Sequence, residues 1–169
     1  MPAMPTQFEM GPYGARICTP VSLLIACQYL LRHALTPEVV LQCMRSAHSL
    51  YAEHFGTSKE PLPMVEEFLH VLPPTLYRAT AVAGPTCFTE TLVEVEDMQL
   101  LPLPQLLLKL RGGSSRVAAV LTMQGHTRCF MFDGQDGATL FDPAVGLACQ
   151  LGELHPKPGE YSGVLLSLR

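Results

Sequence analysis

The sequence predicts an α+β fold, in which helices come first and an antiparallel sheet follows. Two observations lead to this class. Between residues 19 and 72 the apolar side chains recur at helical spacing, whereas from residue 116 onward short runs of strand-forming residues are separated by turn sequences. A chain of 169 residues is expected to form one domain, here residues 1–169.

The helical part is expected to centre on one buried helix. Helices are predicted at residues 19–31, 36–55, 64–72 and 102–111, and residues 1–13 are expected to be extended. The first of these is apolar on nearly every face, which is typical of a helix buried on all sides. The second has a clear start, because Thr36-Pro37-Glu38 supplies an N-cap, a proline at the first helical position and an acid in the first turn.

The sheet is expected to occupy most of the C-terminal half. Strands are predicted at residues 75–82, 88–95, 116–123, 127–132, 138–141, 145–151 and 161–168. The segment Asp133–Gly137 carries two Gly and two Asp between two apolar runs, which is the pattern of a hairpin turn. Strands 127–132 and 138–141 should therefore pair in antiparallel fashion.

Composition excludes several classes of function. The net charge of −4 argues against a nucleic-acid interface, and no apolar run reaches the length of a membrane span. The six cysteines include no CxxC pair, so no metal site is expected. The first ten residues lack the features of a signal peptide. We therefore expect reduced thiols and an intracellular location, in the cytoplasm or the nucleus. If the source is a virus or a bacterium, the cell in question could be the host cell.

One of the cysteines has the surroundings of a nucleophile. Cys18 stands at the start of the predicted central helix, where the helix dipole favours a thiolate. Its own amide is placed to help bind an oxyanion. A cysteine in an apolar helix is more often a core residue, and Cys27 and Cys43 are interpreted in that way.

A histidine and an aspartate complete the candidate site. His126 follows Gly125 and precedes a strand, and Asp142 ends the next strand across the predicted hairpin. A strand, a tight turn and a returning strand would place these two positions side by side. The chain contains no Asn, so Asp142 is the candidate for orienting the imidazole and fixing its tautomer.

This order of residues resembles papain-like cysteine peptidases. The resemblance rests on Gly-Ala-Arg-Ile-Cys at residues 14–18, on Gly125-His126 and on Phe141-Asp142-Pro143, and on the plan of the whole chain. Its length is similar to that of small deubiquitinases, namely Josephin domains and the deubiquitinase domain of herpesvirus large tegument proteins. The resemblance implies a papain-like fold, with the cysteine on the central helix and the sheet at the C-terminal side.

The resemblance also implies an activity and the roles of individual residues. The activity would be hydrolysis, without a cofactor, of the bond after the Gly-Gly tail of ubiquitin or a ubiquitin-like modifier, by a monomer. Cys18 would attack, His126 would be the base and Asp142 would orient it. Gln7 would supply an oxyanion donor. Gly14, Tyr13 and Gly125 would flank a narrow substrate channel.

Two alternatives remain open. The tegument enzymes typically have a catalytic histidine two residues after the aspartate, where this chain has Ala144. A decayed ubiquitin-binding module is therefore one alternative, and a transglutaminase-like thiol acyltransferase is the other. The segment Leu108–Gly113 is similar to the tail of ubiquitin itself, but we interpret it as the end of a Leu-rich helix with a glycine cap.

Overall fold

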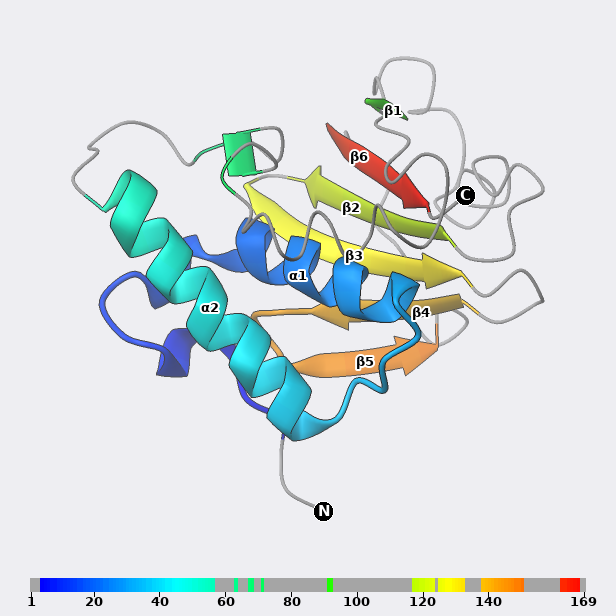
Figure 1. Cartoon of the computed structure of the whole chain (residues 1–169), viewed down its shortest axis with the longest axis horizontal. Coiled ribbons are helices and arrows are strands. Elements are labelled where there is room, and N and C mark those ends of the chain that lie inside the picture. Colours follow the sequence, from blue (N-terminus) through cyan, green and yellow to red (C-terminus); the bar gives the residue numbers. More distant parts are fainter. Residues whose placement is uncertain are drawn as a thin grey trace.

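The structure is a computed structural model that shows an antiparallel sheet covered by helices (Figure 1). It describes residues 4–56, 63, 67–68, 71, 91–92, 117–123, 125–132, 138–150 and 162–167. Helices precede strands along the chain, so the predicted α+β class is confirmed.

The sheet has six strands in the order β1-β6-β2-β3-β4-β5, and every neighbouring pair is antiparallel. The strands are β1 (Thr91–Leu92), β2 (Val117–Met123), β3 (His126–Phe132), β4 (Ala138–Asp142), β5 (Leu147–Gln150) and β6 (Ser162–Ser167). Each observed strand coincides with a predicted strand, and no observed strand extends more than one residue beyond the predicted range. The centre of the sheet, β2 and β3, is formed by a hairpin whose last pair is Met123 and His126.

Helix α1 (Cys18–Leu30) is the central helix of the fold. It packs on β2 and β3 on one side and against α2 (Pro37–Phe55) on the other. Because both sides are covered, its side chains from Cys18 to Cys27 are all buried. The predicted buried helix is thereby confirmed.

Helix α2 begins as the sequence predicts. Thr36 is its N-cap, and the Thr36 hydroxyl accepts a hydrogen bond from the Val39 amide. One face of the helix, which includes Met44, Leu50 and Tyr51, is buried in the common core. The helix therefore holds α1 against the sheet.

The prediction that residues 1–13 are extended is wrong for residues 7–9, and a second turn follows directly after that segment. The two are short 3-10 turns, η1 (Gln7–Glu9) and η2 (Gly14–Arg16). The first is closed locally, because the Glu9 carboxylate accepts a hydrogen bond from the Thr6 amide and the Glu9 amide donates to the Thr6 carbonyl. Such a Thr-x-x-Glu pair is a capping signal that favours a turn over an extended chain.

Several predictions lie wholly or partly outside the described residues. These are the strand at 75–82, the helix at 102–111 with the segment Leu108–Gly113, and the turn Asp133–Gly137. Of the helix predicted at 64–72, residues 67, 68 and 71 are described and are helical. Within the described ranges, no helix has the length and hydropathy that crossing a bilayer requires.

Candidate functional site

Cys18 is the first residue of α1, and the residue is only 4% exposed. The amides at the start of a helix have no acceptor within that helix, and their aligned dipoles favour a negative charge. Pro20 lies within the same first turn, where a missing N–H leaves no hydrogen bond unmade. The fold therefore places a thiol at a position that stabilises a thiolate.

His126 is held at the end of the central hairpin of the sheet. It is the first residue of β3 and pairs with the last residue of β2. Gly125, which precedes it, has a φ of +76°, a backbone conformation that glycine adopts without strain. The imidazole is thus carried by rigid sheet and yet remains partly exposed, with 29% of its side-chain surface accessible.

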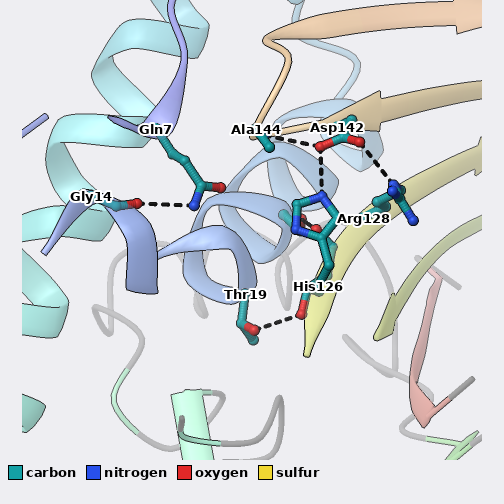
Figure 2. A network of polar contacts seen from close by, with 9 residues as sticks. Gln7, Gly14, Thr19, His126, Arg128, Asp142 and Ala144 are labelled. Atoms are coloured by element: carbon teal, nitrogen blue, oxygen red, sulfur yellow. Dashed lines mark hydrogen bonds and ion pairs between the residues drawn. The ribbon is translucent and has the colours of Figure 1, made fainter. Parts of the chain in front are cut away.

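Asp142 ends β4 and contacts His126 directly. Its Oδ1 lies 2.8 Å from His126 Nε2 and accepts a second hydrogen bond from the Ala144 amide, at 2.9 Å. A carboxylate only accepts, so His126 Nε2 carries the proton of this contact. The two positions that the sequence places side by side are therefore in contact (Figure 2).

Arg128 is a member of the site that sequence reasoning missed. Its Nε donates to Asp142 Oδ2 at 2.8 Å, so both carboxylate oxygens are bonded. The pairing of Cys129 with Phe141, extended by one residue, puts Arg128 directly opposite Asp142 and leaves His126 on the diagonal. The signal was present in the sequence, because residues 126 and 128 share one face of a strand.

These contacts set the charges of Asp142 and His126. Burial opposes the charge of Asp142, but hydrogen bonds from His126 and Arg128 outweigh burial and hold the pKa of its carboxyl well below the usual range. The hydrogen bond to Asp142, followed by that to Cys18, raises the pKa of His126 to about 9. The imidazole is therefore protonated at neutral pH.

The thiol of Cys18 is activated by the same imidazolium. Burial alone would raise the pKa of Cys18, yet the hydrogen bond with the His126 side chain and that with the Thr127 backbone lower it below its ordinary value. Since His126 Nε2 serves Asp142, Nδ1 is the ring nitrogen left for the thiol. The arrangement favours a thiolate–imidazolium pair, which is a nucleophile and a general acid in contact.

The other described thiols lack such surroundings. Burial raises the pKa of Cys27 and of Cys43 to about 12. Burial also raises the pKa of Cys129, which lies in the core. Among these four cysteines, only Cys18 is poised to react.

A chain of three buried or half-buried hydroxyls joins α1 to the sheet beside the thiol. Thr127 Oγ1 lies 2.7 Å from Thr19 Oγ1 and 2.7 Å from Thr122 Oγ1. Ser22 also donates to the Thr127 carbonyl, at 3.3 Å. These contacts fix the start of α1 relative to β3 and so fix Cys18 relative to His126; none of these hydroxyls was predicted from the sequence.

Gln7 lies beside the same turn as Asp142. Its amide N–H donates to the Pro143 carbonyl at 3.0 Å, and its side-chain Nε2 donates to the Gly14 carbonyl at 2.9 Å. The side chain is 2% exposed, and its Oε1 has no hydrogen-bond partner among the described residues. A side-chain amide has two N–H protons and Gly14 takes one, so the second is suited to an oxyanion.

The three residues expected to flank a channel lie in different surroundings. Gly14 is buried, and a side chain there would come within 2.6 Å of the Gln7 carbonyl oxygen, so glycine is needed for the packing of η1 on η2. Tyr13 packs on α2, with its ring against His48 and Tyr51. Gly125 is exposed, and none of the described residues lies within 4 Å of the position of an added Cβ. Of the three, Gly125 is the one beside His126 and the one that is exposed.

Among the residues that the structure describes, no group of three or more His, Cys, Asp or Glu side chains is arranged so that it could hold a metal ion. The chemistry of the site is that of a thiol with an acid and base partner.

The chain was compared with known proteins by sequence and by fold. No protein-family model matches the chain, and no curated protein matches it in sequence.

A solved structure does match. It is the ubiquitin-specific protease encoded by a murine cytomegalovirus tegument protein, in complex with a ubiquitin-based suicide substrate. The TM-score is 0.63 at 16% sequence identity, and the match covers 98% of this chain and 85% of that chain. This chain has a fold similar to that of the viral protease. The likeness extends over almost all of the chain and concerns the fold.

Proposed function

We propose that the protein is a papain-like cysteine peptidase that hydrolyses the bond after the Gly-Gly tail of ubiquitin or a ubiquitin-like modifier. The observation that carries the proposal is one imidazole, His126, that is bonded to the Asp142 carboxylate at 2.8 Å and lies near enough to the Cys18 thiol to lower its pKa. Its pKa of about 9 keeps the imidazole protonated beside a thiol whose pKa is lowered. Such a pair is the reactive form of a thiol hydrolase.

The proposed reaction begins with acylation. The Cys18 thiolate attacks the carbonyl carbon of the terminal glycine, and the negative charge moves to the carbonyl oxygen. The Cys18 amide and Gln7 Nε2 donate hydrogen bonds to this oxyanion. When the intermediate collapses, the C–N bond breaks, His126 gives its Nδ1 proton to the leaving amine, and a thioester joins the tail to Cys18.

Deacylation reverses the role of the histidine. Neutral His126 accepts a proton from water as the oxygen attacks the thioester carbonyl. The C–S bond then breaks, which releases the tail as a carboxylic acid and restores the thiolate–imidazolium pair; the acid loses its remaining proton to solvent. Asp142 orients the ring and stabilises its charge in both steps without itself accepting the proton. No cofactor takes part in this scheme.

The substrate class in this proposal is supported by the fold. The solved relative of similar fold is a ubiquitin-specific protease bound to a ubiquitin-based suicide substrate. The exposure of Gly125, with none of the described residues within 4 Å of an added Cβ, is compatible with the approach of a Gly-Gly tail. The position of Ala144 does not weaken the proposal, because His126 already occupies the place beside Asp142 and the Ala144 backbone supports the same carboxylate.

The test is a ubiquitin probe with a thiol-reactive group at its C-terminus. Wild type and Cys18→Ala are incubated with the probe and compared by intact mass, with Cys27→Ala as the matched control for loss of a thiol. We expect an adduct of one ubiquitin that Cys18→Ala abolishes and Cys27→Ala retains. A folded wild type that gives no adduct, and whose Cys18 is also inert to iodoacetamide, would contradict the enzyme and leave a binding module.

Two further outcomes would point to a thiol enzyme with another substrate or to the remaining alternative, an acyltransferase. Rapid alkylation of Cys18 without a ubiquitin adduct would retain the thiol enzyme and discard ubiquitin as its substrate. A ubiquitin thioester that passes to added primary amines in preference to water would identify an acyltransferase. Release of free ubiquitin from a ubiquitin–peptide isopeptide substrate, dependent on Cys18, is the result that we expect.

A further inference from the structure

Arg128 forms the last link of a row of four charged groups. In the order Cys18, His126, Asp142 and Arg128, the charges of the reactive form alternate in sign and sum to zero. Two of the links are hydrogen bonds: Asp142 Oδ1 lies 2.8 Å from His126 Nε2, and Arg128 Nε lies 2.8 Å from Asp142 Oδ2. In the third, the His126 imidazole lowers the pKa of the Cys18 thiol. Figure 2 shows Arg128 and His126 on either side of the Asp142 carboxylate.

We propose that Arg128 is a positioning residue that locks the Asp142 carboxylate in the orientation that His126 needs, and that its charge limits how firmly His126 holds the catalytic proton. This inference rests on the proposed function, because the proton in question is the one given to the leaving amine. Arg128 contacts Asp142 and is assigned no contact with substrate.

The first part of the inference follows from the geometry of the carboxylate. Two N–H groups, of His126 and Ala144, bond to Oδ1, whereas Arg128 is the donor to Oδ2 among the described residues. Rotation about the last side-chain torsion of an aspartate is soft. Without Arg128 the carboxylate could turn and offer its oxygens to His126 in other orientations. With Arg128 directly across the strand pair, rotation breaks a charge-assisted hydrogen bond.

The second part follows from the balance of charges at His126. The titratable and charged groups that act on His126 in the described structure are Cys18 from α1, Arg128 from β3 and Asp142 from β4. Asp142 raises the pKa of His126, and the charge of Arg128 opposes it. An imidazolium that is held too firmly is a poor acid toward a leaving amine. Arg128 thus keeps the site charge-neutral and keeps the proton transferable.

The test compares Arg128→Gln and Arg128→Lys with wild type. Arg45→Gln is the matched control, because Arg45 is an exposed arginine on α2. The readouts are kcat and KM on a ubiquitin C-terminal amide, and the pH midpoint of the His126 ring signal in NMR spectra. That signal is assigned by its loss in His126→Asn, and its titration requires no substrate.

Arg128→Gln is expected to lower kcat roughly tenfold with little change in KM, since orientation of the acid is lost while the substrate contacts remain. It should also move the His126 midpoint upward, because a positive charge is removed. Arg128→Lys keeps the charge but lacks the planar fork, so the midpoint should stay near the wild-type value while kcat still falls. Arg45→Gln should change neither quantity.

A purely structural role gives a different result. If Arg128→Gln lowers the melting temperature but leaves kcat and the His126 midpoint of the folded protein unchanged, the inference is overturned. If Arg128→Gln does not fold, wild-type kcat in Arg128→Lys would overturn it as well. Failure of the proposed function is seen separately, as absence of ubiquitin hydrolysis by wild type, and the NMR midpoints still decide the charge effect of Arg128.

Discussion

Replacing Asp142 by Asn tests the electrostatic reasoning about the site most directly. The change removes one negative charge and keeps an oxygen that can accept from His126 Nε2. The difference between the ordinary pKa of His, 6.5, and the value of about 9 in this site corresponds to roughly 3 kcal/mol in favour of the imidazolium. Asp142 supplies the largest part, so we expect the pKa of His126 in Asp142→Asn to fall to its ordinary value or below, since the charge of Arg128 remains.

The loss of the imidazolium charge should also change the pKa of the Cys18 thiol. With His126 neutral at pH 7.5, burial of Cys18 is no longer outweighed, and the pKa of the thiol returns toward or above its ordinary value. Only a few per cent of such a thiol is ionised at neutral pH. Together with the loss of the general acid, the expected fall in kcat/KM is on the order of 100-fold or more.

The assay has two arms. Hydrolysis of a fluorogenic ubiquitin C-terminal amide gives kcat/KM, and the rate of iodoacetamide reaction against pH gives the midpoint of Cys18 ionisation. Peptide mapping assigns the adduct and so separates Cys18 from the other cysteines. Glu53→Gln, which removes an exposed carboxylate from α2, is the control. A folded Asp142→Asn protein whose Cys18 midpoint equals that of wild type would refute the reasoning.

Three further predictions concern the pH profile and the packing around the site. The rate of hydrolysis should fall as pH rises through about 9, because His126 loses its proton there. On the acid side the rate should fall only at pH values below the ordinary pKa of cysteine, because the pKa of Cys18 is lowered. A kcat/KM profile from pH 5 to 10 checks both limbs. Thr127→Val should lower the free energy of unfolding by about 1–3 kcal/mol in urea titrations, since it leaves two threonine hydroxyls without their fully buried partner; an unchanged value would show that these contacts contribute nothing. Gly14→Ala should lower kcat and the melting temperature together, because its Cβ would meet the Gln7 carbonyl oxygen at 2.6 Å and displace η1; wild-type kcat would show that Gln7 is not needed in its present place.

Much of the fold could be predicted because its strongest signals are local. The uninterrupted apolar faces of α1 mark a helix with neighbours on both sides, and the cap and proline at residues 36 and 37 mark the start of α2. The contact between His126 and Asp142 was also accessible, because a strand, a short turn and a strand leave little freedom in which residues face each other.

What could not be predicted depends on exact register and on contacts that are distant in sequence. The predicted hairpin places residue 142 beside residue 126, whereas the register of the sheet puts Arg128 opposite Asp142 and His126 on the diagonal. One residue of register decides which side chain shares the carboxylate, and hydropathy does not fix register that finely. The contact between Thr19 and Thr127 joins residues 108 positions apart, and no local pattern announces it.

The separation in sequence between the thiol and its partners has a consequence during synthesis. Cys18 emerges from the ribosome long before His126, Arg128 and Asp142 exist, since these lie on strands β3 and β4. Until that hairpin pairs and α1 docks on it, the thiol has neither the imidazolium nor the Thr127 amide that lower its pKa. The nascent chain therefore carries a cysteine with an ordinary pKa. Little of it is ionised, so oxidants and electrophiles modify it slowly. Cys18 becomes a reactive nucleophile only when β3 and β4 have paired and α1 has docked on them. Its reactivity therefore arises together with the folding of the site.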